Sequence, residues 1–206
     1  MTTTEPGHPE VSIIIPARNE EASLASCLES LVGQTGVAFE IIVVNDHSSD
    51  CTREIASSFR NVKVMDAPAL PAGWTGKNNA LIAGVAPARG EWLLFTDADT
   101  MHLPGSLARA LHEARAAQAA LLSYSPEQVV SGFWEKAVMP VIFAELAAHY
   151  RPSEVSNPNS PAAAANGQYI LISREAYDAI GGHVSVAGRF INNGCAIVHY
   201  RSRHTY

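Results

Sequence analysis

Short apolar runs alternate with helical patterns along the first 125 residues of the chain. The apolar runs are nearly continuous, as expected of strands buried on both faces of a parallel sheet. Strands are predicted at residues 11–15, 39–44, 62–65 and 91–96. After the first of them, residues 19–21 cap a helix whose Leu24, Leu28 and Leu31 lie on one face. This alternation predicts βαβ units, and therefore an α/β fold with a mostly parallel sheet.

Further elements follow the fourth strand. A helix is predicted over residues 104–118, because a proline fits the first helical turn, and residues 119–124 return to the sheet. Residues 167–172 predict another strand. Ser173 then caps a short helix that the two glycines 181–182 end.

Residues 131–150 have a different pattern, typical of a long and mostly apolar helix. Pro140 should kink this helix or divide it in two. Two interpretations stay open: the helix packs on the core or as a lid, or it lies at a membrane interface. Nowhere does the sequence have an uninterrupted run of about 18 apolar residues that would span a bilayer.

Composition narrows the function classes. With 206 residues, 47% hydrophobic and 17% charged, the chain is long and apolar enough for one globular domain. Its net charge is −6 and its 14 Lys and Arg residues are scattered, which argues against a nucleic-acid-binding surface. The three cysteines, at positions 27, 51 and 195, have neither the spacing of a zinc site nor that of a disulfide framework.

Asp97-Ala98-Asp99 directly follows the apolar run of the fourth strand. This position is the carboxyl edge of the sheet, where open α/β folds bind ligands. Two carboxylates there can hold Mg²⁺ or Mn²⁺ against phosphate oxygens, which points to a nucleotide-diphosphate substrate. An aspartate after a strand is also an ordinary turn or helix-capping residue, so the motif alone does not decide.

Further polar strings fall on the same edge of the predicted sheet. They are residues 16–20 (Pro-Ala-Arg-Asn-Glu), 45–50 (Asn-Asp-His-Ser-Ser-Asp), 71–78 (Pro-Ala-Gly-Trp-Thr-Gly-Lys-Asn), 166–168 (Asn-Gly-Gln) and 181–183 (Gly-Gly-His). The glycine-rich phosphate loop that dehydrogenases and nucleotidyltransferases carry after their first strand is missing from 16–20, which disfavours both classes.

These strings, in this order, resemble glycosyltransferase family 2 over residues 11–188. The resemblance implies the GT-A fold, a Rossmann-like mostly parallel sheet flanked by helices in a single domain. It also implies an inverting transfer of a sugar from a nucleotide-diphosphate donor, with a UDP-sugar expected first. The Pro-x-Gly-Trp-x-Gly-Lys string narrows the likeness to members with hopanoid, carotenoid or related lipid acceptors. A cytoplasmic protein at the inner face of the membrane, with peripheral membrane contact, is the matching expectation.

The resemblance also divides the chain. Residues 1–10 are polar, with no signal peptide pattern, and are expected to be a disordered tail. The nucleotide-binding half of the domain is expected at 11–125 and the acceptor-side half at 126–188. Residues 189–206 are basic and form an atypical C-terminal tail.

Residue roles are carried over from the family position by position. Asp46 is expected to meet the nucleotide base, since a carboxylate accepts the N–H groups of uracil or guanine. The backbone of Pro16, Ala17 and Arg18, together with Glu20, is expected to line the nucleoside pocket. Lys77 is expected to meet the diphosphate at a helix start. Asp99 is the expected metal ligand and Asp97 is expected near the ribose or holding the metal indirectly, so both count as catalytic.

Simpler interpretations of these residues stay open. Asp46 could organise a turn, and for Asp50 that turn and capping role is the preferred one. Glu20 could be a first-turn residue favoured by the helix dipole. Lys77 could be a solvated surface lysine. Trp74 could stack on a ligand or simply anchor its loop.

The chain departs from its family at the catalytic base. Inversion requires a group that takes the proton from the acceptor hydroxyl, and relatives carry an acidic residue soon after Gly-Gly-His. No Asp or Glu follows Asp178 here. Either His183 or another group substitutes, or the tail is not family sequence. The alternative function is therefore a catalytically impaired nucleotide-sugar-binding remnant.

Overall fold

The computed structural model describes residues 8–124, 165–186 and 195–196. The main sheet consists of β1 (Val11–Ala17), β2 (Phe39–Asn45), β3 (Val62–Asp66), β4 (Trp92–Thr96), β5 (Leu121–Ser123) and β7 (Tyr169–Ser173). Its strand order is β3-β2-β1-β4-β7-β5. Two-residue strands, β6 (Ala165–Asn166) and β8 (Cys195–Ala196), form a separate antiparallel pair.

The main sheet is mostly parallel, as the sequence predicted. β1 pairs in parallel with β2 and β4, and β2 pairs in parallel with β3. β7 is antiparallel to both of its neighbours, β4 and β5. Its place between β4 and β5 did not follow from the local pattern, because the two strands it separates come earlier in the chain and only long-range pairing inserts it there.

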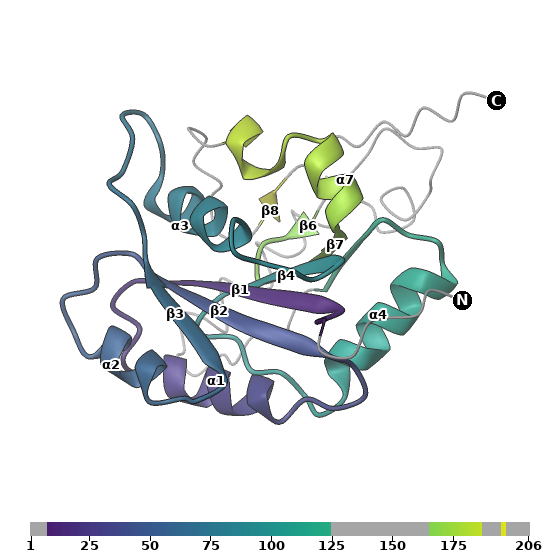
Figure 1. The fold of residues 1–206 in the computed structure, drawn as a ribbon, viewed down its shortest axis with the longest axis horizontal. Coiled ribbons are helices and arrows are strands. Elements are labelled where there is room, and N and C mark those ends of the chain that lie inside the picture. Colours follow the sequence, from purple (N-terminus) through teal and green to yellow (C-terminus); the bar gives the residue numbers. More distant parts are fainter. Residues whose placement is uncertain (1–7, 125–164, 187–194, 197–206) are drawn as a thin grey trace, which may run out of the picture.

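Helices cover both faces of the sheet (Figure 1). One face carries α1 (Leu24–Val32), α2 (Thr52–Ser57) and α4 (Ser106–Ala116), and the other carries α3 (Gly76–Val85) and α7 (Arg174–Ala179). A short 3₁₀ helix, η1 (Gly182–Val186), follows α7. The result is a three-layer arrangement in which both faces of the central strands are hidden.

The burial of β1 explains its unbroken apolar sequence. Ile13 and Ile15 belong to the core beneath α1, whereas Ile14 belongs to the core on the side of α3 and α7. All three side chains are completely buried. Because alternate side chains point to opposite faces, a central strand of a doubly covered sheet is apolar at every position.

Several element boundaries differ from the sequence predictions. α1 begins at Leu24 rather than after a cap at 19–21, because Asn19 has a left-handed φ of 55° and the N–H of Glu20 donates to Thr52 Oγ1. The residues after β1 therefore remain in a loop, and this loop is hydrogen-bonded to the start of α2. α4 begins at Ser106 because Gly105 before it has a φ of 72°, and it ends at Ala116, shortly before Gln118, which has a φ of 50°.

Pro9 and Glu10 are the last two residues of the range 1–10, for which a disordered tail was predicted, and both lie among the described residues. Pro9 is buried, and Oε2 of Glu10 accepts a hydrogen bond from Arg115 at 2.9 Å. The predicted apolar helix at 131–150 lies outside the described residues, and so does the basic tail at 189–206 except for residues 195–196. Within the described ranges, no helix has the length and apolar character needed to cross a membrane.

Candidate functional site

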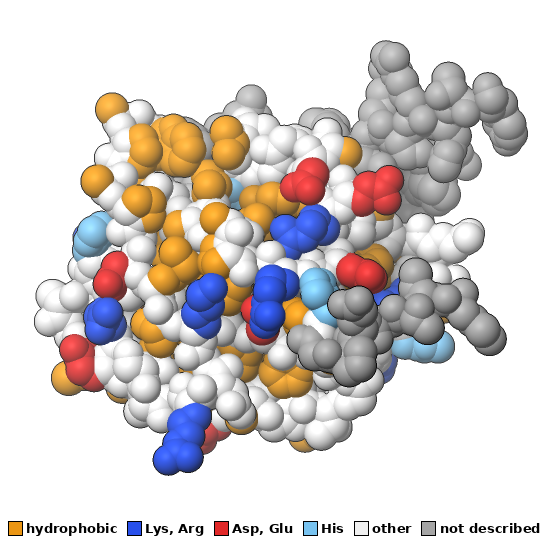
Figure 2. All heavy atoms as spheres, viewed as in Figure 1, with side chains coloured by type: hydrophobic (Ala, Val, Ile, Leu, Met, Phe, Trp, Pro, Cys, Tyr) orange, Lys and Arg blue, Asp and Glu red, His pale blue; other side chains and the backbone are white. Residues whose placement is uncertain are grey.

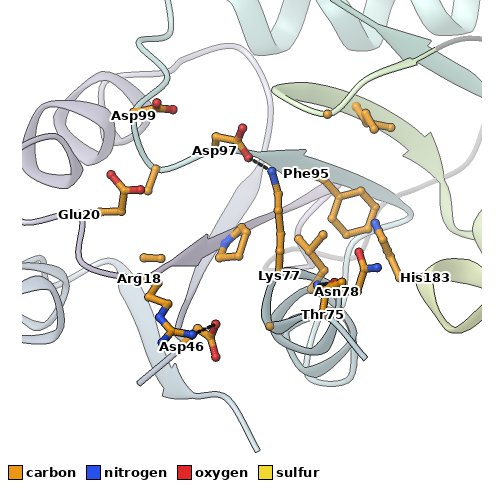
Figure 3. Close-up of a pocket in the computed structure, with 17 residues that line it drawn as sticks. Arg18, Glu20, Asp46, Thr75, Lys77, Asn78, Phe95, Asp97, Asp99 and His183 are labelled. Atoms are coloured by element: carbon orange, nitrogen blue, oxygen red, sulfur yellow. Dashed lines mark hydrogen bonds and ion pairs between the residues drawn. The ribbon is translucent and has the colours of Figure 1, made fainter. Parts of the chain in front are cut away.

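A cavity of about 470 Å³ opens at the carboxyl ends of β1, β2 and β4 (Figure 3). Because these strands are parallel, the polar residues that follow each of them meet at one edge. All the site residues predicted from the sequence line this cavity: Pro16, Ala17, Arg18, Glu20, Asp46, Lys77, Asp97 and Asp99. The fold therefore brings together segments that are far apart along the chain.

Hydrogen bonds hold the loop after β1 against the loop after β2. Asn19 accepts from the N–H of Ser49 at 2.8 Å, and its own N–H donates to Ser48. Asp50 accepts from the N–H groups of Glu21 and Thr52. The turn-organising role preferred for Asp50 is thereby confirmed, and the two loops form one rigid wall of the cavity.

Asp46 lies at one end of the cavity. It is 7% exposed, and its Oδ2 lies 3.6 Å from Nη1 of Arg18. Gly76 packs against it so closely that an added Cβ would fall 2.4 Å from Oδ2. A buried carboxylate with one face toward a cavity and a single cation beside it is suited to accepting N–H groups of a ligand.

The N-terminus of α3 forms the floor beside Asp46. Thr75 caps the helix, since its side chain accepts from the N–H of Asn78 at 3.3 Å. Lys77, in the first turn, donates from Nζ to Oδ1 of Asp97 at 2.6 Å (Figure 3). A helix N-terminus with a lysine in its first turn favours an anionic ligand.

Three further carboxylates line the cavity: those of Glu20, Asp97 and Asp99. Burial, with the charges of these carboxylates, raises the pKa of the nearby Cys27 thiol to about 12. Asp99 is exposed, and its side chain has no hydrogen-bond or ion-pair partner among the described residues. The Cys27 thiol is therefore protonated and unreactive. The negative charge of the Asp99 carboxylate is available to bind a cation.

These carboxylate oxygens could bind a divalent cation such as Mg²⁺ only together with oxygens of water or of the substrate. In the described ranges no group of three His, Cys, Asp or Glu side chains could hold a metal by itself. Mg²⁺ usually takes one or two carboxylates and completes its shell with water and substrate phosphates. Asp99, with Asp97 nearby, matches that pattern rather than an all-protein cage.

His183, from η1, lines the end of the cavity away from Asp46. Its Nδ1 lies 3.0 Å from the hydroxyl of Tyr177, and its ring meets Phe95 edge to face. Burial, with a smaller effect of the Lys77 charge, lowers the pKa of His183 to about 4. The imidazole is therefore neutral at physiological pH.

An apolar wall was missed by sequence reasoning. Leu81 of α3, Phe95 of β4 and Ile170 of β7 also line the cavity. The alternation of β4 could have pointed to Phe95, since it faces the same side as Leu93. Ile170 gave no local signal, because the strand that carries it joins the sheet from far along the chain.

The loop between β3 and α3 presents apolar side chains to solvent and leads into the cavity at Thr75. Leu70 in this loop is 50% exposed, and Figure 2 shows hydrophobic side chains gathered over that corner. Asn79 anchors the loop by donating to the carbonyl of Pro68 at 2.8 Å. Trp74, near its end, does not line the cavity.

Sequence comparison finds one family across most of the chain. The model of glycosyl transferase family 2 matches residues 12–181. The 4,4'-diaponeurosporenoate glycosyltransferase of Staphylococcus aureus strain bovine RF122 / ET3-1 is 31% identical over 194 residues, which cover 92% of this chain and 50% of that protein. The chain thus spans about half the length of the curated relatives it matches.

Structure comparison finds the same fold in solved proteins. TarS of S. aureus (residues 1–349) superposes with a TM-score of 0.51 at 28% identity, over 60% of this chain and 37% of that one. The mannosyltransferase PcManGT of Pyrobaculum calidifontis, solved with GDP-Man and Mn²⁺, gives a TM-score of 0.62 at 22% identity, over 86% of this chain and 48% of that one. The second likeness concerns the fold alone, which is GT-A.

Proposed function

The chain belongs to glycosyl transferase family 2, and we propose that it moves a sugar from a nucleotide-diphosphate donor to a lipid-type hydroxyl acceptor, with inversion at the anomeric carbon. A UDP-sugar is the first expectation for the donor. The single observation that carries the proposal is the convergence of Asp46, Lys77, Asp97 and Asp99 in one cavity at the carboxyl edge of the sheet.

The nucleoside end of the donor is assigned to the walls built by β1 and β2. Asp46 would accept the N–H groups of the base, and its neighbour Arg18 limits the side from which a ligand can approach. The backbone of Pro16 and Ala17, with Glu20, would line the nucleoside. The close packing of Gly76 on Asp46 supports this assignment, because it holds the carboxylate in one place.

The diphosphate end is assigned to α3 and the loop after β4. Lys77 and the backbone N–H groups of Gly76 and Lys77 at the start of α3 would bind phosphate oxygens. Asp99 would hold a Mg²⁺ or Mn²⁺ ion, with Asp97 beside it near the ribose. Such an ion supplies neutralisation of the negative charge that develops on the leaving diphosphate. Lys77, now paired with Asp97, would have to reorient toward the ligand.

A lipid-type acceptor is supported by the name of the relative, a diaponeurosporenoate glycosyltransferase, and by the Pro-x-Gly-Trp-x-Gly-Lys string.

We extend the proposal to peripheral contact with the inner face of the membrane. Flotation with anionic and neutral liposomes tests this part, since a protein that stays at the bottom of the gradient has no such contact.

The donor site is tested by calorimetric titration with UDP, GDP and ADP, each with and without Mn²⁺. We expect one nucleotide to bind in a metal-dependent way. Asp99→Asn should weaken that binding by at least about tenfold, because the amide removes the charge that holds the ion. Glu29→Gln is the matched control, since Glu29 is an exposed carboxylate on α1.

The outcomes separate the possibilities. Failure of the unmodified chain to bind any of the nucleotides contradicts the proposal. Binding that Asp99→Asn leaves unchanged contradicts the metal assignment. If the nucleotide binds but neither donor hydrolysis nor transfer occurs, the chain is the impaired nucleotide-sugar-binding remnant, which the missing acidic base after Asp178 would explain.

A further inference from the structure

Three contacts fix the imidazole of His183. Its Nδ1 lies 3.0 Å from the hydroxyl oxygen of Tyr177, and its backbone N–H donates to the same oxygen at 3.2 Å. The ring also meets Phe95 edge to face, with the ring centroids 4.6 Å apart. Two atoms of one histidine therefore converge on one hydroxyl, while a third contact holds the plane of the ring.

The position of the imidazole proton follows from the groups around Tyr177. The hydroxyl oxygen already accepts the backbone N–H of His183, and burial raises the pKa of Tyr177, so the O–H keeps its proton. Within the described residues its one acceptor is Nδ1 of His183. With Nδ1 as that acceptor, the proton of the neutral imidazole is on Nε2.

The glycine before His183 makes this arrangement sterically possible. Gly182 has a φ of 53°, and an added Cβ would lie 2.6 Å from two ring carbons of Tyr177 and 2.8 Å from its hydroxyl. No side chain fits between the turn and the tyrosine ring. The Gly-Gly-His string thus brings the backbone of η1 onto Tyr177.

His183 lines the cavity, and its Nε2 is not fully buried. This nitrogen has no hydrogen-bond partner in the described part of the chain, and it is absent from the buried side-chain atoms that lack one, which are Thr100 Oγ1 and Tyr169 Oη. In Figure 3 His183 lies across the cavity from Arg18 and Asp46, with Lys77 between them. The Lys77 cation therefore lies between Asp46 and the neutral imidazole, near enough to His183 for its charge to affect the pKa of the imidazole.

We propose that His183 is a fixed Nε2–H donor to an oxygen of the β-phosphate of the nucleotide-diphosphate donor, and that Tyr177 is the positioning residue that sets its tautomer. This inference rests on the proposed function, in which Asp46 binds the base at the opposite end. Because Nε2 already carries a proton, it cannot take one from the acceptor. His183 is a binding group and not the base that the sequence left open.

Binding measurements test the contact. UDP and UMP, or GDP and GMP if the site prefers guanine, are titrated with Mn²⁺ present. His183→Ala should weaken diphosphate binding about tenfold and leave monophosphate binding unchanged, because one hydrogen bond to a charged oxygen is lost. His183→Gln should restore much of the affinity, since its amide N–H reaches a similar position. His112→Ala, an exposed histidine on α4, is the matched control.

Nitrogen NMR tests the tautomer without any ligand. Long-range ¹H–¹⁵N correlation at neutral pH should show Nε2 protonated and Nδ1 unprotonated for the signal that His183→Gln removes. Tyr177→Phe should change that signal to a mixture of tautomers and reduce diphosphate affinity, while circular dichroism stays that of the folded chain. A proton on Nδ1 in the unmodified protein overturns the inference.

The two proposals fail in different ways. If the unmodified chain binds no nucleotide, the proposed function falls, and the phosphate contact of His183 falls with it. If it binds the diphosphate and His183→Ala binds equally well, only the role of His183 is wrong.

Discussion

Beside Asp46 there is room for a backbone but not for a side chain. The Cβ position of Gly76 lies 2.4 Å from Oδ2 of Asp46, and Arg18 stands on another side of the carboxylate. Asp46 is also nearly buried, so it has little space in which to yield. A single glycine therefore sets the position of the carboxylate that we assign to the nucleotide base.

Gly76→Ala tests this dependence. We expect the methyl group to displace the Asp46 carboxylate, to lower the free energy of unfolding by about 1–3 kcal/mol, and to weaken nucleotide binding at least about tenfold. Urea unfolding and calorimetric titration measure the two effects. Gly33→Ala is the control, because its φ is −75° and its added Cβ would make only an ordinary contact at 3.4 Å. Unchanged nucleotide affinity in Gly76→Ala would show that the position of Asp46 does not matter for binding.

At the scale of elements, α3 and α7 begin with the same kind of side-chain N-cap. Thr75 caps α3 by accepting from Asn78, and Ser173 caps α7 by accepting from Ala176, each at 3.3 Å. The predicted cap at Ser173 is thereby confirmed. Only the cap of α3 borders the cavity, so the two positions separate helix stability from ligand binding.

Thr75→Ala and Ser173→Ala should both cost about 1 kcal/mol of stability, because each leaves a helix N–H without its side-chain acceptor. That loss corresponds to a melting temperature lower by about 2–4 °C. Thr75→Ala alone should also weaken nucleotide binding, since it loosens the turn that carries Lys77. Thr75→Ser should restore both properties. An equal effect of the two alanine variants on binding would contradict the separate role of α3.

At the scale of the whole molecule, His102 joins parts that are distant in sequence. Its Nε2 lies 3.2 Å from Oγ1 of Thr96 at the end of β4, and its backbone N–H donates to Ser30 in α1. Its ring also contacts Tyr169 in β7. Burial lowers the pKa of His102 from 6.5 to about 4, so the fold holds it neutral.

This burial predicts acid sensitivity. Between pH 6.5 and 4, His102 is protonated in the unfolded chain but neutral in the folded chain. The free energy of unfolding therefore falls as the pH falls through this window. The loss due to His102 should reach about 3 kcal/mol near the lower limit. Urea unfolding at several pH values measures it, and His102→Gln should flatten the curve. His183, with a similar shift, would keep part of the slope. Identical slopes with and without His102 would contradict the prediction.

The sequence by itself determined the α/β class, the mostly parallel sheet and a set of residues that line one cavity. Apolar runs and helical spacing are local properties, and the carboxyl ends of parallel strands share one edge. Polar residues such as Asp46 and Asp99 could therefore be assigned to one site from their positions directly after predicted strands. The family resemblance then supplied their proposed roles, because the motifs lie in order along the chain.

Only the tertiary structure decided which groups meet. The insertion of β7 between β4 and β5, the pair of Lys77 with Asp97, and the packing of His183 on Phe95 all depend on contacts between distant segments. Local sequence patterns fix the period and the ends of an element, but not its neighbours in space. Long-range packing determines those neighbours, and the contact of His183 with Tyr177 in the folded chain is the basis of our proposal that this histidine donates a hydrogen bond rather than acting as the base.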